Sequence, residues 1–203
     1  MAPRPRIAVL CSGQGTNLQA LMDATRRGRL PATIALVASD RADAYALVRA
    51  RRAGIAAVWI DPRRFSSRAA FDAALLRLLL RERVRLVCLA GFMRVLGPAL
   101  VRRFRHRILN IHPALLPAFK GAHAVRDALA YGVKITGVTV HLVDEGVDTG
   151  PILQQEALPV REDESPERLL ARLHRLEHRL YPEAVRLVLA GKVRVVSRRV
   201  VRR

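Results

Sequence analysis

The chain has 203 residues, which is enough for one well-buried core and short for two independent domains. Hydrophobic residues make up 51% and charged residues 26%, which excludes a disordered chain, and the apolar run at 7–11 is too short for a signal peptide or a membrane span. The net charge of +19 invites a nucleic-acid interpretation, but aromatic residues are only 4% and no base-stacking or helix-turn-helix pattern accompanies the arginines, so solvated arginine faces explain the charge better.

Short apolar runs alternate with helix-like segments along the first half of the chain. The runs are continuously apolar, as is typical of strands buried on both faces. We expect strands at 6–11, 33–39, 56–60, 86–91 and 107–112, and helices at 17–27, 43–53, 67–83 and 97–104. Residues 75–80 are apolar nearly all round, which predicts a helix well packed against the sheet. The alternation predicts an α/β fold with a mostly parallel sheet and helices on both faces.

The regular alternation of apolar runs and helix-like segments ends after residue 112. A loop with two prolines at 113–121 leads to a helix near 124–130, and the extended segments 135–143 and 152–160 indicate antiparallel strands added to the sheet. The longest helix is expected at 165–189, with Ser165 as its N-cap and Pro166 at its first position. We expect one domain over 1–203, with halves at about 1–105 and 106–190. The basic tail 191–203 is either a frayed end or a contact to an anionic partner.

Cys11 and Cys88 each lie in or at the end of an apolar strand-like run. This placement predicts buried free thiols rather than a disulfide framework. Free thiols are typical of a reducing compartment, so we expect a cytoplasmic protein.

The histidines do not form a recognisable metal motif. His174 and His178 are four residues apart with Glu177 between them, while His123 and His141 stand apart from them. There is no His-Glu-x-x-His pattern and no cysteine pair at finger spacing, so we expect no metal.

A glycine-rich loop, Ser-Gly-Gln-Gly-Thr-Asn at 12–17, stands between the first strand and the first helix. Such glycines let the backbone approach a ligand, and a helix N-terminus offers free N–H groups to an anion. Leu18 stands where a dinucleotide fingerprint would have its third glycine, and the Lys-Ser/Thr of a P-loop is missing. The loop therefore suits a single phosphate. The alternative is a plain turn in which Thr16 or Asn17 caps the helix.

Asn110 and His112 are two residues apart at the end of a predicted strand that Pro113 closes. Strand side chains alternate, so both should leave the same face at the carboxyl edge, where open α/β sheets build their sites. Asp148 lies in a glycine-flanked turn further along. Each of the three also has a structural interpretation: a strand-end cap, a satisfied core histidine and a turn former.

Together the three residues suit addition and elimination at a carbonyl. Asn110 and a protonated His112 can stabilise a tetrahedral oxyanion, and histidine can also protonate a leaving nitrogen. A neighbouring carboxylate favours the charged imidazole, and Asp148 is the candidate for that role. No Gly-x-Ser-x-Gly nucleophile is present, which favours direct transfer without a covalent enzyme intermediate.

Six strings of the chain, in order and spread over about residues 6–190, carry a resemblance to a known family. They are 12–17 with the Leu-Gln-Ala that follows, 89–96, 109–117, 137–141, 144–151 and 177–182. With them the chain resembles the phosphoribosylglycinamide formyltransferases of purine biosynthesis. The Asn-x-His-Pro element is common to formyltetrahydrofolate-dependent transferases, whereas the 12–17 loop and the Glu-His…Tyr-Pro string point to the ribonucleotide enzymes. The resemblance implies a Rossmann-like formyltransferase fold and formyl transfer from 10-formyltetrahydrofolate to the amine of 5-phosphoribosylglycinamide.

The resemblance also implies roles for individual residues. The catalytic residues would be Asn110, His112 and Asp148. The substrate phosphate and ribose would be held by Gly15, Thr16, Asn17, His174 and Glu177. The folate would contact Arg68, Met93, Arg94, Val95, Leu96, Asn110, Asp144, Glu145, Gly146, Val147 and Asp148. His174 stands where some members of the family carry glutamine, and the basic tail is not part of the family pattern.

The implied partners are small molecules, without membrane or nucleic acid, and a homodimer is left open. The same chemistry on methionyl-tRNA is one rival, but that family normally carries an additional C-terminal domain. Hydrolysis of formyltetrahydrofolate is another, but that family carries an additional N-terminal domain, and here the first strand begins near Arg6. A nucleic-acid-binding α/β module is the third, and binding that weakens steeply with salt would distinguish it.

Overall fold

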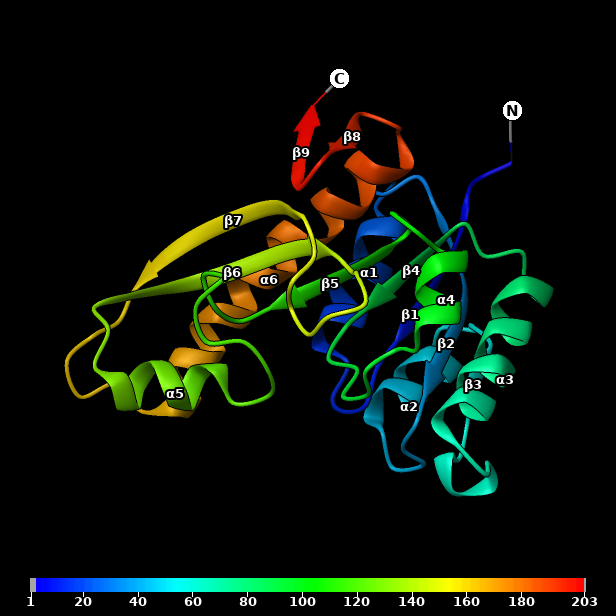
Figure 1. Cartoon of the computed structure of the whole chain (residues 1–203), viewed down its shortest axis with the longest axis horizontal. Coiled ribbons are helices and arrows are strands. Elements are labelled where there is room, and N and C mark those ends of the chain that lie inside the picture. Colours follow the sequence, from blue (N-terminus) through cyan, green and yellow to red (C-terminus); the bar gives the residue numbers. More distant parts are fainter. Residues whose placement is uncertain (1–2, 203) are drawn as a thin grey trace.

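The computed structural model describes residues 3–202 and is organised around one seven-stranded sheet in the order β3-β2-β1-β4-β5-β6-β7 (Figure 1). The first five strands run parallel, and β6 and β7 are antiparallel additions at one edge. This arrangement confirms the predicted mostly parallel sheet with antiparallel strands in the second half. The strands are β1 Arg6–Leu10, β2 Thr33–Ser39, β3 Ala57–Trp59, β4 Leu86–Leu89, β5 Ile108–His112, β6 Ile135–Leu142 and β7 Ile152–Pro159.

Helices cover both faces of the sheet, because successive residues of the buried strands point to opposite sides. In β1, Ile7 and Val9 join one core cluster, with α1 and α6, while Ala8 and Leu10 join a second one, with α3 and α4. No helix within residues 3–202 combines the length and apolar character needed to cross a membrane. The helices are α1 Thr16–Arg26, α2 Tyr45–Arg52, the 3₁₀ turn Pro62–Arg64, α3 Arg68–Arg81, α4 Pro98–Arg103, α5 Ala124–Tyr131 and α6 Pro166–Leu189.

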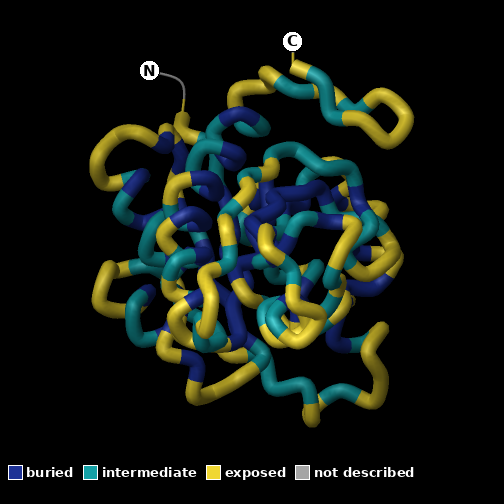
Figure 2. Tube along the Cα trace, turned by 90° about the vertical axis from the view of Figure 1, so that its left-hand side faces the viewer, coloured by how far each residue is buried: buried dark blue, intermediate teal, exposed yellow. Residues whose placement is uncertain are grey.

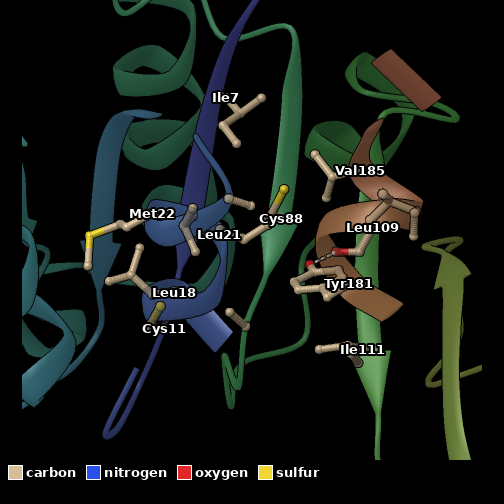
Figure 3. Close-up of a cluster of buried hydrophobic side chains, with 14 of the residues drawn as sticks. Ile7, Cys11, Leu18, Leu21, Met22, Cys88, Leu109, Ile111, Tyr181 and Val185 are labelled. Carbon is tan, nitrogen blue, oxygen red and sulfur yellow. Dashed lines mark hydrogen bonds between the residues drawn. The ribbon is translucent and has the colours of Figure 1, made fainter. Parts of the chain in front are cut away.

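Tyr181 of α6 is completely buried and reaches the centre of the sheet (Figure 3). Its hydroxyl lies 2.8 Å from the carbonyl oxygen of Leu89 in β4 and 3.0 Å from that of Leu109 in β5, and so donates to both. This contact joins α6 to two neighbouring strands just before Asn110.

Cys11 and Cys88 are buried free thiols, as predicted. Burial raises the pKa of the Cys11 thiol to about 12 and also raises the pKa of Cys88. Neither sulfur is therefore suited to act as a nucleophile at neutral pH.

Of the two alternatives for the basic tail, the frayed end is wrong, and the contact to an anionic partner stays a prediction. The end of the chain is not frayed, because β8 (Val193–Val196) and β9 (Arg199–Arg202) pair as an antiparallel hairpin that stands at the surface (Figure 2). In α3, Leu75 and Leu79 are buried and Leu76 and Leu78 pack against the same core cluster, which confirms the predicted helix packed against the sheet, although Leu80 is 41% exposed. The helix needs only one buried stripe to cover its side of the sheet.

Candidate active site

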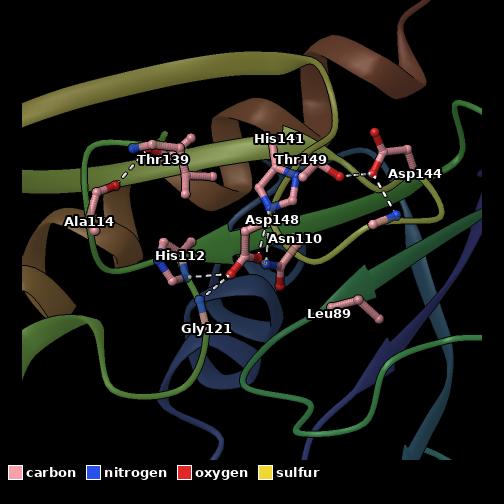
Figure 4. Close-up of polar contacts among 12 residues, drawn as sticks. Leu89, Asn110, His112, Ala114, Gly121, Thr139, His141, Asp144, Asp148 and Thr149 are labelled. Atoms are coloured by element: carbon pink, nitrogen blue, oxygen red, sulfur yellow. Dashed lines mark hydrogen bonds and ion pairs between the residues drawn. The ribbon is translucent and has the colours of Figure 1, made fainter. Parts of the chain in front are cut away.

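Asn110 and His112 leave the same face of β5, as the strand alternation predicted. β5 ends at His112, directly before Pro113, and the His112 side chain is only 4% exposed. Asp148 comes from the loop between β6 and β7 and holds a positive φ of 50°. Asp148, which is distant in the sequence, therefore meets Asn110 and His112 at one edge of the sheet (Figure 4).

The Asp148 carboxylate is the centre of this cluster (Figure 4). Its Oδ2 accepts from the backbone N–H of Gly121 at 2.8 Å and lies 3.4 Å from Nδ1 of His112. Its Oδ1 accepts from the Asn110 amide at 3.2 Å and lies 3.4 Å from Nε2 of His141. Burial by itself would raise the pKa of Asp148, but the contacts with His141, Gly121 and His112 outweigh it and lower the pKa to about 2. Asp148 is therefore ionised at neutral pH.

Both ring nitrogens of His112 face acceptors. Nε2 lies 2.8 Å from the carbonyl oxygen of Phe119, which can only accept, so Nε2 carries a proton in this arrangement. Nδ1 faces the Asp148 carboxylate at 3.4 Å. A proton on Nδ1 would therefore face the Asp148 carboxylate.

His141 belongs to the cluster, although the sequence analysis left it as an isolated histidine. It is 2% exposed and stands directly opposite Asn110 in the β5–β6 register, with its Nε2 3.1 Å from the Asn110 amide nitrogen. Its Nδ1 lies 3.0 Å from the carbonyl oxygen of Leu142, which can only accept, so Nδ1 carries a proton. The alternation of 135–143 placed Thr139 and His141 on one face, and this was the available signal.

A hydrogen-bond network centred on the buried Thr139 holds the start of the loop 113–121 in place. The Thr139 hydroxyl donates to the Ala114 carbonyl at 2.7 Å and accepts from the Leu116 N–H at 3.1 Å. Gln155 of β7 donates to the Leu116 carbonyl at 2.8 Å and to the Thr139 hydroxyl at 2.9 Å. The network fixes the loop that supplies the Phe119 carbonyl to His112, and sequence reasoning missed it.

The glycine-rich loop meets α1 at Gly15, which caps the helix in the left-handed conformation with φ 71°. A Cβ at this position would stand 2.8 Å from Cβ of Ala46, so glycine is required for both reasons. No side chain caps α1, and Thr16 and Asn17 lie inside the helix, so the alternative of a cap by either residue is wrong. The N–H groups of the first turn are left for an anion.

Arg49 of α2 braces the same loop and was not identified from the sequence. Its Nε donates to the Gln14 carbonyl at 2.9 Å, and its Nη1 donates to the Gln19 side chain at 3.1 Å. Arg49, Thr16 and His178 line a cavity of about 330 Å³ beside the start of α1. A cation therefore lies close to the predicted phosphate loop.

Asn17 and Glu177, which are 160 residues apart in the sequence, meet in the interior. The Asn17 amide donates to Oε2 of Glu177 at 2.8 Å, and Glu177 is only 4% exposed. Burial raises the pKa of Glu177, against the opposing effects of Asn17, His174 and His112. The Nε2 of His174 is 3.9 Å from the Glu177 carboxylate, so this second predicted contact is loose. Oδ1 of Asn17 is buried and has no partner within residues 3–202.

Apolar side chains are exposed in the two loops that the resemblance assigned to folate. Met93 is 65% exposed, Val95 44% and Val147 49%, whereas Leu96 is buried at 4%. Both loops therefore leave apolar side chains at the surface.

Arg68 and Arg94 lie together beside the first of these loops. Arg68 donates to the Leu96 carbonyl at 3.2 Å, and its side chain is 51% exposed. The guanidinium of Arg94 stacks over the Phe71 ring at 4.7 Å. Arg94 thus belongs to the first of these loops, and Arg68 of α3 is bonded to it.

The loop 144–148 is shaped mainly by its own contacts. Asp144 accepts from the Thr149 hydroxyl at 2.6 Å and from the Gly146 N–H at 3.1 Å. Glu145 accepts from Arg102 of α4 at 3.1 Å. Asp144 and Glu145 therefore stabilise the loop that carries Asp148.

Residues 5–185 match the formyl transferase family. The chain belongs to the formyl transferase family. Within it, the chain is 46% identical over 193 residues to the phosphoribosylglycinamide formyltransferase of Mycobacterium tuberculosis, a match that covers 95% of this chain and 89% of the relative. The crystal structure of glycinamide ribonucleotide transformylase 1 from Symbiobacterium toebii matches with a TM-score of 0.97 and 53% identity, over 100% of this chain and 95% of that one.

Some relatives in the family are much longer. The chain is 45% identical over 195 residues to the trifunctional purine biosynthetic protein adenosine-3 of Chironomus tentans. That match covers 95% of this chain but only 14% of the relative. The formyl transferase fold thus occurs both in proteins of about this length and as part of a larger chain.

Proposed function

We propose that the chain is a phosphoribosylglycinamide formyltransferase that transfers the formyl group of 10-formyltetrahydrofolate to the amine of 5-phosphoribosylglycinamide. The family membership and the names of its similar relatives support this activity. The observation that carries the proposal is the convergence of Asn110, His112 and Asp148 at the carboxyl edge of β5. A buried Asn17–Glu177 pair lies near enough for the charge of His112 to influence Glu177.

In the proposed reaction the substrate amine attacks the formyl carbon directly. The Asn110 amide and the protonated His112 stabilise the oxyanion of the tetrahedral intermediate. His112 then protonates the folate nitrogen as its bond to the formyl carbon breaks, and it takes up the proton that the attacking nitrogen loses, so the imidazolium is restored. Asp148 stays ionised and stabilises the imidazolium, in keeping with its pKa of about 2. In this step the N–H at Nε2 of His112 must leave the Phe119 carbonyl, to which it donates in the structure, and donate to the reacting group instead.

The substrate phosphate is assigned to the start of α1. Gly15, Thr16 and Asn17 supply first-turn N–H groups that no side chain caps, and the helix dipole favours an anion there. Glu177 is assigned to the ribose hydroxyls, since its buried carboxylate can accept from them. His174 is assigned a contact at the phosphoribosyl end.

The folate is assigned to the exposed apolar side chains of Met93, Val95 and Val147. Arg68 and Arg94 would meet its anionic tail. The donors and acceptors of the Asp148 loop would meet the polar edge of the ring. A cytoplasmic location is also proposed on the basis of the two buried free thiols. A homodimer stays a prediction from the sequence.

The test is to mix the purified chain with phosphoribosylglycinamide and 10-formyltetrahydrofolate and to follow the folate absorbance. Formylated phosphoribosylglycinamide is the expected product, with methionyl-tRNA and water as control acceptors. A Thr16→Ala variant should raise the KM for phosphoribosylglycinamide more than the KM for the folate. Release of formate without an acceptor, or transfer to the tRNA alone, would overturn the proposal.

A further inference from the structure

The C-terminal hairpin packs against the loop that carries Asp148. Nη2 of Arg198, in the turn between β8 and β9, donates to the Thr149 carbonyl at 2.7 Å. Strand β9 also contacts β7. The hairpin lies beyond residues 5–185, which match the family, and none of the roles assigned to the proposed function uses it.

A cavity of about 340 Å³ opens between the hairpin, the loop 113–121 and the start of β7. Its walls carry three cationic side chains, one from the loop and two from the hairpin. The lining residues are Leu116, Pro117, Lys120, Asp148, Thr149, Gly150, Pro151, Ile152, Arg198, Arg199 and Val200.

The positive charge of this cavity is not neutralised by the surrounding protein. Within residues 3–202, Lys120, Arg198 and Arg199 form no ion pair with a carboxylate. Asp148 is the only acidic residue in the lining, and its carboxylate is directed to Gly121, Asn110 and the two histidines instead. The cavity therefore presents cations without a counter-charge.

The size and chemistry of the cavity indicate the class of ligand. Ligand cavities of small molecules begin at about 300 Å³, so this one is larger than a single ion requires. Guanidinium groups bind phosphate and carboxylate oxygens through paired N–H donors, and a lysine adds a point charge. Arg198 uses one donor on Thr149 and keeps the others for a ligand.

We propose that the hairpin and Lys120 form a binding pocket for a small molecule that carries two or more anionic groups, phosphates or carboxylates. The pocket shares Asp148 with the proposed active site but does not include the start of α1 or the loop 92–96. Through Arg198 and Thr149, its ligand lies next to the loop of Asp148.

The test is isothermal titration calorimetry of the whole chain with inorganic pyrophosphate and, separately, with a γ-linked triglutamate. Arg198→Ala, Arg199→Ala and Lys120→Ala should each weaken binding by about tenfold or more, as expected for the loss of a charge-assisted contact. Lys120 lies outside the hairpin, so its variant tests the pocket even if the arginine variants disturb the hairpin. Which of the two probes binds decides between a phosphate and a carboxylate ligand.

Arg194→Ala is the matched control. Arg194 lies on the same hairpin, lines a different cavity and carries the same charge. Equal weakening in Arg194→Ala would show an effect of overall charge and overturn the proposal, as would the absence of binding to either probe. Displacement of the probe by saturating phosphoribosylglycinamide would also overturn it, because the probe would then occupy the phosphate site at α1. None of these readouts depends on formyl transfer.

Discussion

Replacement of Asp148 by asparagine should change how stability depends on pH. The contacts of Asp148 lower its pKa from 3.8 to about 2, so the ionised carboxylate stabilises the folded state above pH 4. This contribution is lost as the pH falls from about 4 towards 2. A shift of this size corresponds to about 2 kcal/mol in total, of which about 1 kcal/mol is lost by pH 3.

Urea unfolding of the wild type and of Asp148→Asn between pH 6 and pH 3 measures this contribution. The free energy of unfolding of the wild type should fall by about 1 kcal/mol more than that of the variant over this range. Asp127→Asn, which removes an exposed carboxylate of α5, is the control and should follow the wild type. Parallel curves for the wild type and Asp148→Asn would refute the reasoning, because the surrounding histidines and N–H groups would then not stabilise the charge. At pH 7 the same variant should lower kcat by about 10²- to 10⁴-fold.

His112→Ala should abolish formyl transfer, and because the side chain is buried and contacts Phe119 and Asp148, it should also lower the free energy of unfolding by about 1–3 kcal/mol; normal turnover would exclude His112 from the mechanism. Thr139→Val should lower the free energy of unfolding by about 2–3 kcal/mol, because it leaves the Ala114 carbonyl and the Leu116 N–H without their partner. Thr136→Val on the same strand is its control, since the buried Thr136 hydroxyl has no partner within residues 3–202 and its loss should be neutral or stabilising. Equal costs for the two threonine variants, read from urea titrations, would contradict the role of the network.

The sequence was sufficient for the parts of the fold that depend on local pattern. Continuous apolar runs predicted the five parallel strands within one or two residues of their observed ends, because strands buried on both faces need no alternation. The common face of Asn110 and His112 followed from the two-residue period of a strand. The glycine-rich loop before α1 was recognisable because its glycines directly precede a helical pattern.

The missed parts depend on contacts between distant segments. His141 joins the site only because the β5–β6 register places it opposite Asn110, and one sequence does not reveal that register. Gln155 reaches the loop 113–121 from the edge strand β7 for the same reason. In the tail, valine and arginine alternate as in a strand, but the density of charge favoured a frayed end. The hairpin forms because its backbone pairs with itself, whatever its charge.

One helix, α6, connects the glycine-rich loop at the start of α1 with the end of strand β5. Glu177 and Tyr181 are one turn apart on α6, so they share a face of the helix. Glu177 accepts a hydrogen bond from Asn17 beside the glycine-rich loop. Tyr181 donates to the backbone of β5 directly before Asn110. Any sliding of α6 along its axis would displace both contacts at once, so this one helix fixes the distance between the glycine-rich loop and the end of β5.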